Sequence, residues 1–124
     1  MEVYDLAHRL ARALAKCGEC AEFAKARDGA AANEETRRML QDYYRRQAAL
    51  IRRSAAGEEP AASAVKELEQ LREVIAFHPL VKELFAAEHR LLILRDDVLR
   101  IIVDGMRPWF DLGELAPELD AGEG

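Results

Sequence analysis

The sequence predicts an all-α fold: an antiparallel bundle of four main helices plus a short helical segment, with the long C-terminal helix as its spine. Ala, Leu, Glu and Arg dominate, whereas Gly and Pro are confined to a few junctions, which is a helical composition. Apolar residues recur with a helical period, and no run alternates as a strand would. A chain of 124 residues can bury a core without disulfides or metal. We therefore expect one domain, residues 1–110, followed by a disordered acidic tail, residues 111–124.

The first two helical segments flank Gly18. A helix near 2–16 is predicted by apolar residues at helical spacing: Val3, Leu6, Leu10 and Leu14. Phe23 and Ala26 resume the apolar face after Gly18, and Asp28-Gly29 then forms a stop signal. The second segment is therefore expected near 19–28.

A third helix is predicted from Asn33 to about Ala55. Asn33 is a favourable N-cap, and the two acids that follow it suit the positive end of the helix dipole. Gly57 ends this helix, and Pro60 suits the first turn of the next one.

The fourth and fifth helices meet at His78-Pro79. The fourth carries a single apolar stripe: Val65, Leu68, Leu71, Val74 and Ile75. A residue before proline is pushed out of the α region, so this junction predicts a sharp corner, with His78 as the cap of the last helix.

The last helix is expected to run from Pro79 to about 104, where Gly105 and Pro108 close it. Its apolar residues cover about half of its circumference, more than one neighbouring helix needs, so we expect it to pack on two sides or more. Trp109 and Phe110 are expected to fold back onto the bundle.

Charge and segment composition narrow the class of protein. The net charge of −5 arises in residues 111–124, which hold five acids and no Lys or Arg, so the rest of the chain is formally neutral. A neutral body argues against non-specific nucleic-acid binding by net charge. The first residues lack a secretory pattern, and charges interrupt the stretch 80–103, so we expect no transmembrane segment and a cytoplasmic protein.

The third helix is basic on one face and apolar on the other. Six arginines fall within half a turn of its helical wheel: Arg37, Arg38, Arg45, Arg46, Arg52 and Arg53. They form a candidate face for an anionic partner, such as an acidic protein, RNA or anionic lipid. The alternative is a solvated face balanced by neighbouring acids, which the neutral body favours.

The last helix carries a candidate seam for self-association or a partner. Its members follow one side of the helix: Leu84, Glu88, Leu91, Arg95, Val98 and Ile102. Glu88 and Arg95 lie within the apolar arc, where an unpaired charge is costly, so each is expected to contact another helix or subunit. The equally favoured alternative is that both side chains reach the edge of the arc and water.

Metal and catalytic chemistry find little support in the residues. Cys17 and Cys20 could supply half of a four-thiolate metal site completed by a second subunit. The lack of further cysteines favours two small free thiols beside a helix break, in a reducing compartment. No nucleophile motif or phosphate loop is present, so we expect no enzyme and no catalytic residue.

The chain resembles the YlbF/YmcA family of small all-helical bacterial regulators over about residues 3–104. The resemblance rests on the order and spacing of several short motifs: Val3-Tyr4-Asp5-Leu6-Ala7 with Leu10, Phe23, Asn33-Glu34, Met39-Leu40 with Tyr43, Gln47, Gly57-x-x-Pro60, Ile75-x-x-His78-Pro79-x-Val81, Ala87-Glu88-x-x-Leu91 and Ile101-Ile102.

The resemblance implies a non-enzymatic adaptor that acts in protein complexes, either a homo-oligomer or assemblies with other family members and an endoribonuclease. It links the chain to biofilm formation, competence, sporulation and mRNA processing. The family's best-known complex carries iron-sulfur clusters bound in one branch by a Cys-rich tail. The tail here has no cysteine, so we expect no cofactor.

Overall fold

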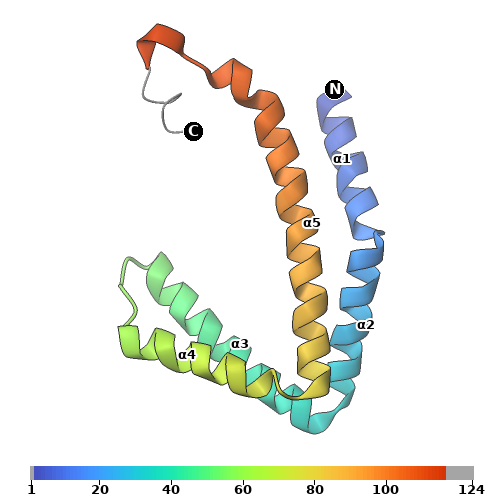
Figure 1. Ribbon diagram of the computed structural model, residues 1–124, viewed down its shortest axis with the longest axis vertical. Coiled ribbons are helices and arrows are strands. Elements are labelled where there is room, and N and C mark those ends of the chain that lie inside the picture. The colour runs from blue at the N-terminus through green and yellow to red at the C-terminus, as the bar shows by residue number, and fades with distance from the viewer. Residues whose placement is uncertain (1, 117–124) are drawn as a thin grey trace. The chain divides into compact units, whose positions relative to one another are not determined.

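The computed structural model describes residues 2–116. Met1 and residues 117–124, the end of the expected acidic tail, lie outside the described residues. The elements follow one another along the chain as α1 (Glu2–Ala15), α2 (Gly18–Ala32), α3 (Glu34–Ala55), α4 (Ala62–Ile75), α5 (Pro79–Phe110) and the short 3₁₀ helix η1 (Gly113–Leu115) (Figure 1). The all-α prediction is confirmed, with no strand among residues 2–116.

Three predicted helix boundaries are wrong. Pro60 does not lie in the first turn of α4, because α4 begins at Ala62 with Ala61 as its N-cap. Helix α2 continues through Gly29 to Ala32 because Ala30 is buried in the core, and that packing outweighs the cost of a helical glycine. Helix α5 continues through Gly105 and Pro108 to Phe110. Since Pro108 lies in the last turn, it removes only one backbone hydrogen bond and does not end the helix.

The chain divides into two units, residues 1–91 and residues 92–124. In the first, α3 and α4 run antiparallel, joined by a loop in which Gly57 has a positive φ (Figure 1). Helix α2 packs on α3, and the first turns of α5 close the core. The buried apolar residues come from four helices: Ala26, Ala30, Leu40, Tyr43, Ile75, Val81, Leu84, Phe85 and Ala87. Helix α1 contributes none of them.

The corner between α4 and α5 is built around His78, and its predicted capping role is confirmed. The backbone N–H of Leu80 donates to His78 Nδ1 at 3.2 Å. The opposite nitrogen, Nε2, therefore carries the hydrogen and lies 3.3 Å from the hydroxyl of Thr36, a fully buried residue. That hydroxyl in turn donates to Asn33 Oδ1 at 2.9 Å, and Asn33 also caps α3 as predicted.

A second polar contact joins three helices across the core. The guanidinium of Arg72 in α4 lies over the Phe85 ring of α5, 4.0 Å from its centroid. The same group donates a 3.0 Å hydrogen bond to the hydroxyl of Tyr43, which is buried in α3. Arg72 therefore satisfies a buried phenol and stacks on an aromatic ring at once.

In the second unit, α5 is largely open to solvent. The exposed apolar residues of this part of the helix are numerous: Leu92, Ile93, Leu99, Ile101, Ile102, Val103, Met106, Trp109 and Phe110. The buried residues of α5 all precede residue 91: Val81, Leu84, Phe85 and Ala87. Trp109 is 86% exposed and lies in the last turn of α5, just after Pro108.

Candidate functional site

The six predicted arginines of α3 differ in how they are paired. Arg38 binds Glu34 at 2.8 Å and Arg46 binds Asp42 at 3.1 Å, both one helical turn away. The other four have no acidic partner among residues 2–116: Arg37, Arg45, Arg52 and Arg53. The expected balance by neighbouring acids therefore holds for two of the six positions.

One edge of this arginine face borders a hollow between α2 and α3. Its volume is about 590 Å³. Its lining includes Arg37 and Arg45 of α3 and Arg27 of α2, which pairs with Asp28 at 3.2 Å, and Leu40 and Leu84 contribute apolar surface. Two arginines without an acidic partner in the described part of the chain, beside apolar side chains, suit a ligand that carries both negative charge and hydrocarbon.

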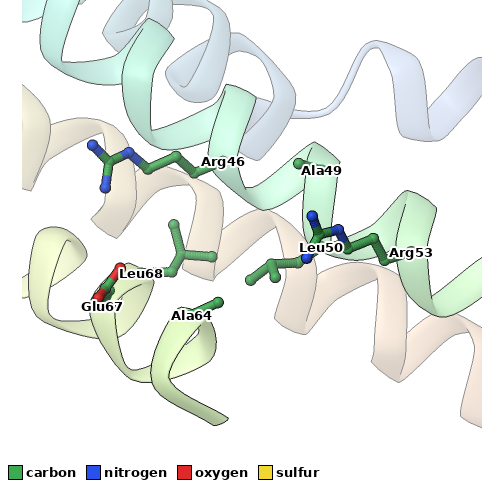
Figure 2. Close-up of a pocket in the computed structure, with 7 residues that line it drawn as sticks. All are labelled: Arg46, Ala49, Leu50, Arg53, Ala64, Glu67 and Leu68. Carbon is green, nitrogen blue, oxygen red and sulfur yellow. The ribbon is translucent and has the colours of Figure 1, made fainter. Parts of the chain in front are cut away.

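The opposite edge borders a smaller hollow between α3 and α4, of about 280 Å³. Figure 2 shows Leu50 of α3 and Leu68 of α4 directed into it, with Arg46 and Arg53 extending from α3 along its side. Glu67 of α4 lies on the other side, so this hollow is less cationic than the first. The arginine face is therefore flanked by two apolar depressions of different charge.

Glu88, a predicted seam residue, finds its partner on another helix. Its Oε2 accepts a 3.3 Å hydrogen bond from the hydroxyl of Tyr44 in α3. Burial, followed by the charge of the Glu88 carboxylate, raises the pKa of Tyr44 to about 12. This contact lies within one chain and joins α5 to α3.

The other seam residues lie in several environments. Arg95 pairs with the adjacent Asp96 at 3.0 Å, and both side chains remain exposed. Leu84 is buried in the core of the chain itself. Leu91 and Val98 are half-buried, and Ile102 is 44% exposed. The accessible part of the candidate seam therefore begins near Leu91.

Cys17 and Cys20 are free thiols at the junction of α1 and α2. Cys17 is the N-cap of α2, with an extended backbone, and its Sγ accepts the backbone N–H of Cys20 at 3.4 Å. The Cys20 thiol donates to the carbonyl oxygen of Leu14 at 3.0 Å. The hydrogen bond with Cys17, followed by burial, raises the pKa of the Cys20 thiol.

These thiols do not fit an iron-sulfur cluster within one chain, because a cluster needs about four thiolates and the sequence has two cysteines. Among residues 2–116, no three His, Cys, Asp or Glu side chains gather closely enough to hold a metal ion.

Sequence reasoning missed three residues that shape these surfaces: Arg27, Thr36 and Arg72. Arg27 pairs with the adjacent Asp28 and lines the hollow between α2 and α3. Thr36 and Arg72 contact residues far away in the sequence, and the Thr36–His78 pair is separated by 42 positions. No local motif marks such pairs. The only signal was a long polar side chain beside an apolar stripe, as at Arg72 after Leu71.

Comparisons with known proteins agree on one family. Residues 3–107 match the family described as "Control of competence regulator ComK, YlbF/YmcA". A UPF0342 protein of Caldicellulosiruptor bescii is 33% identical over 104 residues, covering 84% of this chain and 87% of the relative. A UPF0342 protein of Halothermothrix orenii is 29% identical over 106 residues, covering 86% and 90%.

Within residues 2–116, no helix combines the length and the hydrophobicity that crossing a membrane requires. The family match spans most of the chain, includes all five α-helices up to residue 107 and agrees with the motifs quoted from the sequence. The chain therefore belongs to the YlbF/YmcA family, a family of regulators named for control of ComK.

Proposed function

We propose that this protein is a cytoplasmic regulatory adaptor, without catalytic activity, that works by binding other proteins. One observation carries the proposal: apolar side chains remain exposed along α1 and along α5 beyond residue 91. Contiguous exposed apolar surface is a hallmark of protein interaction sites. Family membership supports a regulatory role, and the processes we propose are competence, biofilm formation or sporulation, acting through mRNA processing.

The partner of α1 is, on this proposal, a helix of another YlbF/YmcA-family protein. The apolar side of α1 is a stripe that matches a helix-in-groove contact: Val3, Leu6, Leu10 and Leu14. Leu6 is 51% exposed and Val3 is 72% exposed. No residue of α1 is buried, so changes there leave the core intact.

Affinity purification of the tagged protein from its native cells tests this proposal. We expect mass spectrometry to recover a second family member or an endoribonuclease with the wild type. Leu6→Lys is expected to lose that partner at least tenfold, while Arg12→Ala on the opposite side of α1 keeps it. Circular dichroism checks that both variants retain helix. Recovery of the tagged protein alone, or equal recovery with Leu6→Lys, would contradict the adaptor proposal.

A second candidate function is binding of RNA or anionic membrane through the arginine face. The observation in its favour is that four of the six arginines lack an acidic partner among residues 2–116. Phosphate binding by several arginines makes affinity fall steeply with salt.

This candidate predicts a loss of RNA or vesicle binding when Arg37, Arg45 and Arg52 are replaced by Glu. The matched control replaces Arg38 and Arg46, which are already paired. Gel-shift and vesicle sedimentation assays at two salt concentrations distinguish the ligands. Binding that is equal in both variants and insensitive to salt would eliminate this function.

A further inference from the structure

The geometry points to Cys17 and Cys20 as a dithiol that closes reversibly to a disulfide at the first turn of α2. Within a regular helix, residues three apart have Cβ atoms about 5–6 Å from each other, whereas a disulfide needs about 3.5–4.5 Å. Cys17 escapes this limit because it is the N-cap, with φ −70° and ψ 161°, and lies outside the helix. An N-cap side chain turns back over the first turn, toward the third helical residue.

That third residue is Cys20, and the hydrogen bonds of the pair assign a role to each sulfur. The backbone N–H of Cys20 reaches Cys17 Sγ, so the two residues already approach each other in the reduced protein. Cys20 holds its proton in a hydrogen bond to Leu14 O. Cys17 is therefore placed to attack first, and Cys20 to resolve the intermediate.

A low-molecular-weight disulfide, RSSR, is the oxidant that this pair would meet. Cys17 gives its proton to water, and its thiolate attacks one sulfur of RSSR. The S–S bond of the oxidant breaks, and RS⁻ leaves and takes up a proton. Cys20 then loses its proton and attacks Cys17 Sγ, which releases a second RSH. The two cysteines lose two electrons together, and the oxidant becomes two thiols.

Closure has a structural consequence at the junction of two helices. Cys20 loses the proton that it donates to Leu14 O in the last turn of α1. The reduced state alone therefore holds this link between α1 and α2. Both side chains are only half-buried, so a small oxidant can reach them.

Thiol trapping across a series of glutathione and glutathione-disulfide ratios tests the inference. After acid quench and alkylation, mass spectrometry of the wild type should show both thiols lost together, in one chain and without a glutathione adduct. Cys17→Ser and Cys20→Ser should each accumulate a mixed disulfide, with Cys17 in the second variant reacting at least several-fold faster.

A positional control separates geometry from simple proximity. Cys20→Ala combined with Ala21→Cys keeps two thiols but moves the second one off the capping position, and it should accumulate glutathione adducts instead of closing. Circular dichroism confirms folding of each variant. Stable adducts on both wild-type cysteines, a disulfide between two chains, or equal closure by the moved pair would overturn the inference.

Discussion

At the scale of single residues, polar contacts between positions far apart in the sequence decide which substitutions the first unit, residues 1–91, tolerates. Tyr44, Arg72 and Thr36 each bind a group from a distant part of the sequence. Removing one partner of a buried hydrogen bond leaves the other unsatisfied, which costs about 1–3 kcal/mol. Substitutions at these side chains should therefore destabilise the fold, whose core is otherwise held together by apolar packing.

Arg72→Met should lower the free energy of unfolding by about 1–3 kcal/mol, because the buried Tyr43 hydroxyl loses its partner and Phe85 loses a stacked cation. Arg100→Met is the matched control: Arg100 forms an exposed pair with Asp97, and its loss should cost less than about 0.5 kcal/mol. Urea denaturation measures both. Equal effects would remove the special role of Arg72.

The raised pKa of Tyr44 predicts a loss of folding stability at alkaline pH. An unfolded tyrosine loses its proton near pH 10, whereas folded Tyr44 keeps it until about pH 12. The unfolded state therefore binds fewer protons in this window, and the free energy of unfolding falls as the pH rises. Because Tyr44 is half-buried and screened by solvent, the loss should be about 1 kcal/mol rather than the full value of the shift.

Tyr44→Phe should remove that part of the alkaline decline. Tyr4→Phe, which changes an exposed tyrosine of α1, should keep it. Denaturation curves between pH 9 and 12 give the comparison. A wild type and Tyr44→Phe variant that decline in parallel would contradict the assignment.

At the scale of helices, periodicity predicted the existence of all five α-helices but not of η1, and breakers predicted the helix ends less well. The start of α3 after Asn33 was predicted correctly because a capping side chain acts within one turn. The stop at Gly29 was wrong because burial of Ala30, a tertiary effect, extends α2. The spacing of the arginines predicted the arginine face of α3. The two hollows along its edges could not be predicted, because α2 and α4 form their other walls.

Gly29 and Gly57 form a matched pair for testing this view. Gly29 lies inside α2, and the space that an added methyl group would fill is open, so Gly29→Ala should raise the free energy of unfolding by about 0.5–1 kcal/mol. Gly57 has φ +83°, so Gly57→Ala should lower it by about 1–2 kcal/mol. Thermal denaturation measures both, and effects of the same sign would refute the argument.

At the scale of the whole molecule, we expect self-association, which would cover apolar surface that one chain leaves open. The accessible members of the predicted seam are Leu91, Val98 and Ile102, and their neighbours on α5 include many exposed aliphatic side chains. In water, exposure of this much hydrocarbon is unfavourable unless another surface covers it. The sequence could predict the stripe but not the number of chains that share it.

Light scattering after size exclusion should give at least twice the mass of a single chain. Ile102→Asp should shift that mass toward the single chain, because a charge at an apolar contact is costly to bury. Arg100→Gln, on the opposite side of α5, should leave it unchanged. A wild type that remains a single chain at high concentration would refute self-association.

The hydrogen bonds among Asn33, Thr36 and His78 tie the start of α3 to the start of α5. Neither corner can therefore fray without disturbing the other, and the two should open as a single cooperative event. Hydrogen exchange would reveal this as a common opening rate for the Thr36 and Leu80 amides. Thr36→Val should speed hydrogen exchange at both amides. Two helix starts that lie 44 residues apart in the sequence would then open together.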